Sequence, residues 1–448
     1  MEKIYIETYG CQMNFADSEI VGSILSTAGY VLTNNLEEAD FVLINTCAIR
    51  DNAEQRVRHR VRELRARQSR QRGLRIGILG CMAERLQSQL MAEEDNVSFV
   101  CGPDAYRRLP ELLAQVREER GKHAGLAEVD LSTTETYADI EPVRLGSNGI
   151  SAYISIMRGC QNYCAYCVVP YTRGRERSRD PETIVREARH LFEQGYKEVT
   201  LLGQNVNSYR WHTQEACGEG GTDFPELMAR VAEISPALRV RFATSHPKDL
   251  SDKLLEVMAA HDNICRCIHL PVQSGSDRML KLMNRHYTVE WYLDRVDSIR
   301  RHLPDCSITT DVIAGFSTET IEDHQATLDL FRRVRYDYAY MFKYSLRPNT
   351  YAARHLADDI PEDEKTRRLN EIIALQGEIA LENNRHDVGH EYEVLVEGTS
   401  HRSADRLFGR NSQNKVIVFD RGNAEAGTYR RVRVEDCTAA TLLGVLMD

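Results

Sequence analysis

The run Met157-Arg-Gly-Cys-Gln-Asn-Tyr-Cys-Ala-Tyr-Cys167 places three cysteines, Cys160, Cys164 and Cys167, on one short segment. Thiolates in a reducing protein select zinc, copper(I) or iron–sulfur clusters. Most [4Fe-4S] clusters take four cysteines, so a C-x3-C-x2-C triplet would leave one iron of a cubane open to a small molecule. Zinc knots usually show a second cysteine pair or a nearby His at ligand spacing, and none follows Cys167. The pattern therefore favours a cluster over zinc.

Length and composition set the class of protein. At 448 residues the chain is long enough for two or three domains, and its apolar and charged fractions are typical of globular proteins. No apolar run reaches the length of a membrane span, and the chain opens on a strand pattern rather than a signal peptide. Twelve cysteines in this setting indicate reduced thiols rather than disulfides. We therefore expect a cytoplasmic protein with no membrane partner.

The formal net charge of -10 gives no support to a nucleic-acid partner. Basic charge is nevertheless concentrated between Arg50 and Arg75, where arginines greatly outnumber acidic residues. Such a run predicts either a solvated helix face or a phosphate contact, and the sequence leaves both open.

Strand and helix patterns alternate over residues 1 to about 120. Buried strands are predicted over residues 3–8, 41–45 and 75–80, and helices over 17–28, 52–70 and 107–120. Such alternation predicts a parallel sheet covered on both faces. Cys11, Cys47 and Cys81 each follow one of these strands, and sites in open α/β sheets form outside the strand carboxyl ends. We therefore expect these cysteines to meet at one edge of the sheet, although ordinary buried thiols are the alternative.

A second strand–helix series begins at residue 150, after a stretch rich in Gly, Ser, Thr and Glu that predicts a linker. Predicted strands cover residues 153–157, 198–202, 240–243, 267–270, 308–313 and 338–342. The main helices between them cover 181–194, 225–234, 251–260, 289–302 and 320–334. Six such units predict a partial (β/α)6, TIM-like barrel with its chemistry at the strand carboxyl ends. The loop with Cys160, Cys164 and Cys167 follows the first of these strands.

A long amphipathic helix is predicted over residues 362–385. Short alternating strands over 391–397, 407–409, 415–419 and 429–436 then predict a small antiparallel barrel of the oligonucleotide-binding type. The predicted organisation is therefore an N-terminal α/β domain over 1–121, a linker over 122–149, the partial barrel over 150–384 and the small β-barrel over 385–448.

Runs along the whole chain resemble the radical S-adenosylmethionine (SAM) methylthiotransferase family, and the tail resembles a TRAM domain. The matching runs are Thr8-Tyr-Gly-Cys-Gln-Met-Asn14, Asn45-Thr-Cys-Ala-Ile-Arg-Asp51, Gly80-Cys-Met-Ala-Glu-Arg85, residues 159–176, Thr200-Leu-Leu-Gly-Gln-Asn-Val-Asn-Ser-Tyr209, Thr244-Ser-His-Pro247, Leu270-Pro-Val-Gln-Ser-Gly-Ser276 and Asp311-Val-Ile-Ala-Gly-Phe316. The segment from Cys11 to Asn14 resembles the branch acting on N6-dimethylallyladenosine in tRNA. One departure is His286, which stands where a glycine is common.

The resemblance implies two [4Fe-4S] clusters. The first would be held by Cys160, Cys164 and Cys167 and bind SAM; the second, an auxiliary cluster carrying the sulfur to be transferred, would be held by Cys11, Cys47 and Cys81. It implies that one SAM methylates this sulfur and that a second is cleaved to a 5′-deoxyadenosyl radical. Carbon 2 of adenine has a strong C–H bond and no useful acidity, so cofactor radical chemistry is required. The implied product is 2-methylthio-N6-dimethylallyladenosine at position 37, beside the anticodon of tRNA.

The resemblance also suggests residues that contact SAM. They are Tyr166 beside the third cysteine of the loop, and Gly203, Gln204, Asn205, Ser245 and Gln273 at the ends of the second, third and fourth barrel strands. Ordinary hydrogen bonding at strand ends is the alternative for each. The other cysteines, Cys101, Cys217, Cys265, Cys267, Cys306 and Cys437, are assigned to no metal.

Implied partners are the tRNA anticodon stem-loop, gripped by the tail barrel, and a reductase or flavodoxin-type electron donor. The sulfur donor stays open. One alternative function is methylthiolation of threonylcarbamoyladenosine in tRNA or of a ribosomal-protein aspartate. A non-enzyme alternative is an RNA-binding protein stabilised by metal.

Overall fold

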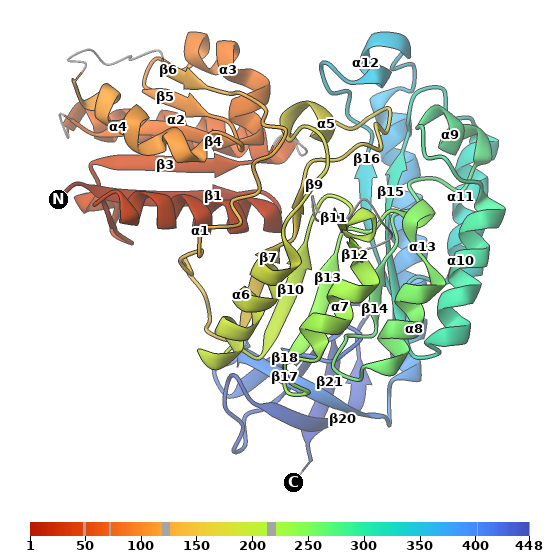
Figure 1. Ribbon diagram of the computed structural model, residues 1–448. Helices are drawn as coiled ribbons and strands as arrows, with labels where there is room; N and C mark the ends of the chain where they lie inside the picture. Colours follow the sequence, from red (N-terminus) through yellow and green to blue (C-terminus); the bar gives the residue numbers. More distant parts are fainter. Residues whose placement is uncertain (48–50, 71–72, 119–125, 213–220, 401, 448) are drawn as a thin grey trace.

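Figure 1 shows the computed structural model, in which residues 1–447 are described apart from 48–50, 71–72, 119–125, 213–220 and 401. An N-terminal α/β domain lies beside a partial barrel, and a small β-barrel lies below the latter. Cys217 and two arginines of the basic run, Arg50 and Arg72, fall outside the described residues. Within the described part of the chain, no helix is both long and apolar enough to cross a membrane.

The N-terminal sheet is parallel, in the order β2-β1-β3-β4-β5-β6. Its strands are β1 (Lys3–Tyr9), β2 (Val31–Leu32), β3 (Phe41–Thr46), β4 (Arg75–Gly80), β5 (Phe99–Cys101) and β6 (Leu126–Glu128). Its helices are α1 (Gln12–Thr27), α2 (Asp51–Arg70), α3 (Cys81–Glu93) and α4 (Leu109–Glu118). Apolar residues of α1 and α4 pack on one face, and those of α2 and α3 on the other. Every residue of β3 is therefore buried, which confirms the predicted sheet covered on both faces.

The segment expected as a linker is packed where it is described. Residues 126–128 pair with β5 as strand β6. Tyr137 is buried, stacks on Tyr106 with ring centroids 5.8 Å apart, and lies under the Arg158 guanidinium. A single buried side chain such as Tyr137 leaves no periodic pattern in the sequence. The Gly, Ser, Thr and Glu content of the segment therefore suggested a linker. The domain boundaries at residues 121 and 149 stay predictions.

The central domain is the predicted partial barrel. Its parallel strands are β7 (Ser151–Ser155), β10 (Glu198–Leu202), β13 (Arg239–Ala243), β14 (Cys267–His269), β15 (Ser307–Ala314) and β16 (Tyr338–Lys343). A bridge between Val240 and Ile264 joins the two halves of this wall. The helices outside it are α6 (Pro181–Glu193), α7 (Phe224–Ala232), α8 (Asp252–Ala260), α10 (Val289–His302), α11 (Ile321–Val334) and α13 (Glu362–His386). Their apolar faces and the outward residues of the strands form one large core.

Shorter elements were not predicted. They are the helices α5 (Val169–Thr172), α9 (Asp277–Leu282) and α12 (Tyr351–His355), and the hairpins β8 (Met157–Arg158) with β9 (Arg177–Ser178) and β11 (Arg210–His212) with β12 (Gly221–Asp223). In Figure 1 the three helices gather at the carboxyl ends of the barrel strands. Periodicity needs several turns to show, so elements this short escape sequence reading.

The inner face of the barrel is polar. Glu198 on β10 and Arg241 on β13 form an ion pair with an N–O distance of 2.7 Å. On β14 and β15, the Nε2 of His269 lies 3.4 Å from the Oδ1 of Asp311. Tyr340 pairs with Asp311 in the β15–β16 register and is about half exposed. Closed TIM barrels fill this space with packed branched side chains, whereas this lumen keeps polar and accessible groups.

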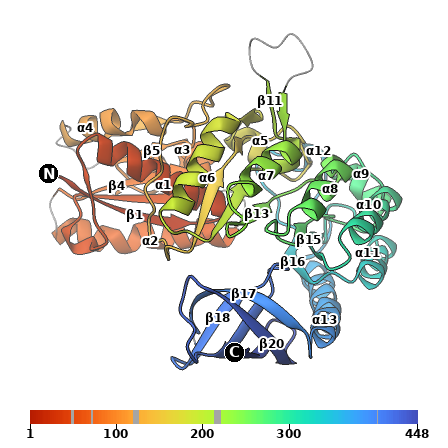
Figure 2. The same cartoon turned by 60° about the horizontal axis from the view of Figure 1, so that its bottom comes forward.

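The tail is a closed barrel in the order β17-β18-β19-β21-β20, as predicted for the oligonucleotide-binding type. Its strands are β17 (Glu391–Thr399), β18 (Arg406–Arg410), β19 (Val416–Asp420), β20 (Tyr429–Cys437) and β21 (Leu442–Leu446). Figure 2 shows it below the amino ends of the central strands. There Arg239 donates to the Arg410 carbonyl and Arg241 to the Asn411 carbonyl, each at 2.8 Å. The tail therefore closes the floor of the central barrel, away from the strand carboxyl ends.

Candidate metal centres

The cysteines predicted to converge on the N-terminal sheet follow strands that are neighbours in it. Cys11 follows β1, Cys47 follows β3, and Cys81 follows β4 as the first residue of α3. A hydrogen bond from Cys47 and the nearby Arg173 guanidinium lower the pKa of the Cys11 thiol to about 6. Burial instead raises the pKa of Cys81. Metal ligation requires these thiols as thiolates. We name these three cysteines the sheet triad.

Close backbone approach holds the sheet triad in place. Gly80 has φ +86°, and a Cβ on it would lie 2.4 Å from the Asn45 Oδ1 and 2.8 Å from the Thr46 carbonyl. Only glycine fits such a turn without strain. Asn14 donates to Asn45 at 3.2 Å, and both side chains are fully buried. These amides fix the turns that present Cys11 and Cys81.

The cysteines of the C-x3-C-x2-C run lie on the loop between β8 and α5, and we name them the loop triad. The Cys160 amide donates to the Gly174 carbonyl at 3.1 Å, and the Cys167 amide to the Cys164 carbonyl at 2.9 Å. Arg285 donates from Nη1 to the Cys164 sulfur at 3.3 Å. Burial raises the pKa of Cys160 to about 11 and raises that of Cys167 as well. Such thiols become thiolates only when a metal replaces the proton.

Both triads fit a cluster better than a single ion by the chemistry of their donors. Each offers three thiols and an arginine N–H directed at one sulfur, a contact that orients and tunes a bound cluster. Among the described residues, no group of three or more His, Cys, Asp or Glu is arranged to hold one metal ion. A cubane spreads its ligands over several irons and so sets them further apart than the ligands of one zinc.

The two triads meet at one domain interface. Cys81 packs against Val168, the residue after Cys167, in a small buried cluster. Arg173, which caps α5, donates from Nε to the Cys81 sulfur at 3.1 Å and from Nη2 to Asp17 at 2.7 Å. Asp17 on α1 also accepts from Arg158, two residues before Cys160, at 2.7 Å. A buried chain of ionic contacts therefore runs from one triad to the other.

Several buried polar groups at the strand carboxyl ends have no hydrogen-bond partner among the residues that the structure describes. They include Gln204 Oε1 after β10, and Ser245 Oγ and His246 Nε2 after β13. Buried polar atoms are rarely left unsatisfied, so these are available to a bound molecule. Two of them belong to the residues predicted to contact SAM, Gln204 and Ser245.

The other predicted SAM contacts have mixed surroundings. Asn205 donates to Asp249 at 2.7 Å and accepts a hydrogen bond from the His246 amide at 3.0 Å. These contacts match the alternative to SAM binding, which is ordinary hydrogen bonding at a strand end. Gln273 has φ +73° and exchanges backbone hydrogen bonds with β15. Gly203 has no room for a side chain, because a Cβ would lie 2.5 Å from Met157. Tyr166 packs edge-on to Phe316 with centroids 6.3 Å apart.

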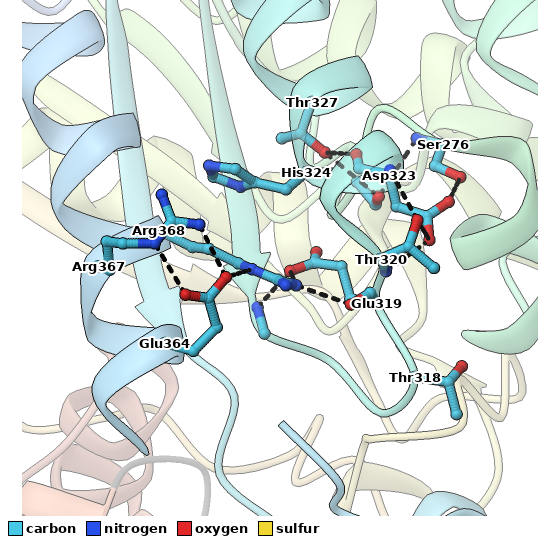
Figure 3. Close-up of polar contacts among 12 residues, drawn as sticks. Ser276, Thr318, Glu319, Thr320, Asp323, His324, Thr327, Glu364, Arg367 and Arg368 are labelled. Atoms are coloured by element: carbon cyan, nitrogen blue, oxygen red, sulfur yellow. Dashed lines mark hydrogen bonds and ion pairs between the residues drawn. The ribbon is translucent and has the colours of Figure 1, made fainter. Parts of the chain in front are cut away.

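Figure 3 shows how the loop after β15 is fixed. Glu319 accepts the Gly315 amide at 2.8 Å, and Arg368 of α13 donates to the same carboxylate at 2.8 Å. Asp323 of α11 accepts from Ser276 at 2.5 Å, which ties the loop after β14 to its neighbour. Burial raises the pKa of Glu319 against the opposing effect of Arg368. The rim of the barrel is thus held by buried ion pairs rather than left loose.

Sequence reading did not single out Asp17, Arg158, Arg173 or Arg285. Their roles depend on contacts between distant segments, which no spacing reveals. One usable signal was present, since Arg173 lies in the run Val169-Pro-Tyr-Thr-Arg-Gly-Arg-Glu176 directly after the loop triad. A basic residue beside metal-binding cysteines is a candidate partner for their sulfur atoms.

Three family models match the chain. Residues 3–102 match "Uncharacterized protein family UPF0004", residues 154–331 the "Radical SAM superfamily" and residues 385–447 the "TRAM domain". A tRNA-2-methylthio-N(6)-dimethylallyladenosine synthase of Bacteroides thetaiotaomicron is 57% identical over 99% of this chain and 96% of its own. That of Amoebophilus asiaticus is 56% identical over 98% and 92%.

Solved structures share the fold at low identity. A radical S-adenosylmethionine methyltransferase, TsrM, from Kitasatospora setae aligns with a TM-score of 0.58 at 15% identity, covering 79% of this chain and 75% of that one. The cobalamin-dependent S-adenosylmethionine radical enzyme OxsB aligns with a TM-score of 0.54 at 12% identity, covering 84% and 56%. At such identities the likeness concerns the fold alone.

Fold, loop triad and family models together define a protein of the radical SAM superfamily with a TRAM domain, and that superfamily implies a [4Fe-4S] cluster and SAM. The two relatives share more than half of their residues with this chain over nearly its full length, which narrows the class of protein to one family. The chain belongs to the family of tRNA-2-methylthio-N(6)-dimethylallyladenosine synthases.

Proposed function

We propose that the protein is a radical SAM tRNA methylthiotransferase, which adds a methylthio group to carbon 2 of N6-dimethylallyladenosine at position 37 of tRNA. The family's named activity and the runs shared along the whole chain support this function. When bound, the clusters and SAM supply the radical and sulfur chemistry that an unactivated C–H bond requires.

The six cysteines of the two triads are the proposed ligands. The loop triad would hold the cluster that binds SAM, and the sheet triad would hold an auxiliary [4Fe-4S] cluster that carries sulfur. The single observation that carries this function is the contact of Cys81 with Val168 and Arg173, two residues of the segment that directly follows the loop triad. A methylthiotransferase must bring the group that activates carbon and the group that carries sulfur to one adenine, and an interface that joins the segments of both triads supports this proposal.

The chain's own residues position the reactants. Gln204 and Ser245 offer their unpartnered oxygens to SAM at the strand ends, with Tyr166, Gly203, Asn205 and Gln273 around them. The tail closes the lumen floor through Arg239 and Arg241, so the adenine enters from the rim near α5 and α12. Unpaired bases in RNA loops can be splayed out and bound in a pocket, as the anticodon loop would be here.

Partners follow from this chemistry. The substrate is the tRNA anticodon stem-loop, which the TRAM barrel grips through cationic side chains on strands such as β20. Reductive cleavage of SAM needs an electron from outside the chain, for which a reductase or flavodoxin-type donor is suited. Two SAM molecules are consumed for each methylthio group.

The test uses anaerobically reconstituted full-length protein, SAM, dithionite and three anticodon stem-loop RNAs. These carry adenosine, N6-dimethylallyladenosine or N6-threonylcarbamoyladenosine at position 37, and products are read by nucleoside mass spectrometry. We expect a methylthio product from the dimethylallyl RNA alone. Product from the threonylcarbamoyl RNA instead would assign the protein to that substrate. Absence of product from all three, with both clusters loaded, would contradict the function.

A further inference from the structure

Arg173 is buried with one donor group unused. Its side chain is only about 4% exposed, Nε donates to the Cys81 sulfur, and Nη2 donates to Asp17. Nη1 is buried and has no hydrogen-bond partner among the described residues. A buried guanidinium with an unused N–H carries a desolvation cost, so the site is built for one more acceptor.

Arg285 shows that this spare donor is not general to the arginines beside the triads. It donates from Nη1 to the Cys164 sulfur, from Nη2 to the Pro271 carbonyl and from Nε to the Tyr287 hydroxyl. Every nitrogen of Arg285 is therefore used. Of the two arginines that donate to a triad sulfur, Arg173 is therefore the one with an unused nitrogen among the described residues.

The charge around Arg173 points to an anionic acceptor. In the described parts of the chain, Arg158, Arg173 and Arg177 share a buried network with the carboxylates of Asp17 and Asp104. A buried cation without a matching carboxylate is costly, so this positive environment favours anionic groups beside Arg173. Small sulfur anions accept charge-assisted hydrogen bonds from guanidinium groups.

We propose that Arg173 binds the transferable sulfur at the sheet triad, through a hydrogen bond from Nη1 to a small sulfur anion such as hydrosulfide or methanethiolate. This inference rests on the proposed function, which gives that triad the sulfur-carrying cluster. Asp17 holds the guanidinium in orientation, and Nε keeps it beside Cys81. Arg173 also caps the carboxyl end of α5. It therefore links sulfur binding to the segment that follows the loop triad.

The test isolates the auxiliary cluster in the full chain by replacing the loop triad, Cys160→Ala, Cys164→Ala and Cys167→Ala. Sodium sulfide and sodium methanethiolate are titrated separately into the reduced protein, and binding is followed by electron paramagnetic resonance. Arg173→Lys in this background should weaken binding about tenfold or more, as expected for loss of a charge-assisted hydrogen bond. A loss with one anion alone would identify which form of sulfur Arg173 binds.

Arg179→Lys in the same background is the matched control, because Arg179 is also a buried arginine but pairs with Glu187 away from both triads, and it should leave both affinities unchanged. Equal affinities for Arg173→Lys and its parent would overturn the proposal. If Arg173→Lys fails to load a cluster, electron–nuclear double resonance on the Arg173-intact parent with bound methanethiolate decides the question. An exchangeable proton coupling that appears with the anion supports the proposal, and its absence overturns it. Neither readout depends on product formation, so the proposed function is tested separately.

Discussion

The two cysteine triads differ in how the chain assembles them. The loop triad sits within eight residues between Cys160 and Cys167, so a single loop suffices to hold it. The sheet triad depends on β1, β3 and β4 lying side by side, since its members are far apart in sequence. A local site can form before the domain is complete, whereas a site made by sheet register exists only in the folded, docked domain. Perturbing the interface should therefore harm the sheet triad far more than the loop triad.

The largest effect is expected from removing the loop triad. Replacing Cys160, Cys164 and Cys167 by Ala should halve an iron content of about eight per chain and abolish 5′-deoxyadenosine formation, because each triad is matched to one cubane. Iron analysis and chromatography of the reaction check this. SAM cleavage by this variant, or zinc in place of iron in the parent protein, would contradict the assignment of the loop triad to the cluster that binds SAM.

Asp17→Asn should harm the sheet triad and leave the loop triad working. Removing the charge between Arg158 and Arg173 leaves two buried arginines without their shared carboxylate, and breaking such a contact costs about 3–5 kcal/mol. We expect loss of auxiliary iron while 5′-deoxyadenosine formation persists. Glu19→Gln, on the same helix, is the control: Glu19 pairs with Arg144, which keeps Glu187 as a second partner, and not with Arg158 or Arg173. Equal iron in the two variants would show that Asp17 does not support the sheet triad.

Substitutions in the TRAM barrel should leave the iron bound at both triads unchanged. Deleting it would uncover Arg239 and Arg241, so a milder change is preferable: Arg431→Ala with Arg433→Ala on β20, whose side chains are well exposed. Affinity for the stem-loop should fall several-fold, and the slope of log affinity against log salt should decrease by about one to two. Arg332→Ala, which changes an exposed side chain of α11, is the control. Unchanged binding would move the RNA contact to the arginine-rich helix α2.

A smaller effect concerns the helix that begins with Cys81. Burial, reinforced by Asp104 and Asp130, raises the pKa of Glu84 from 4.5 to about 8. The folded state thus binds a proton that the unfolded state has released, so this group's contribution to stability falls as pH rises between those values. Thermal unfolding midpoints at pH 5 to 8 should decline less in Glu84→Gln than in the parent. Parallel declines would contradict the raised pKa.

The longer strands and the partial barrel could be predicted because they follow local strand and helix periods, whereas the short strands β2, β5, β6 and β21 were not predicted. The cysteine spacing and the cysteines placed directly after strands suggested the two triads, whose role as cluster ligands stays a prediction. Helix α1 begins at Gln12, before the predicted residue 17, because a capping box formed by Cys11 and Asn14 starts it without an apolar period. Helix α3 went unseen; it is irregular at Leu86. The Arg173–Asp17–Arg158 contacts join three distant segments, and nothing short of the folded interface shows them.

The central claim is that radical generation and sulfur delivery belong to different triads, and one reaction tests it most directly. Full-length protein with Cys11, Cys47 and Cys81 replaced by Ala is given SAM, dithionite and the dimethylallyl stem-loop, and 5′-deoxyadenosine and the methylthio nucleoside are quantified in the same sample. We expect 5′-deoxyadenosine to form without any methylthio nucleoside. Methylthio product from this variant would contradict the account, because the sheet triad could then not be the site that delivers sulfur.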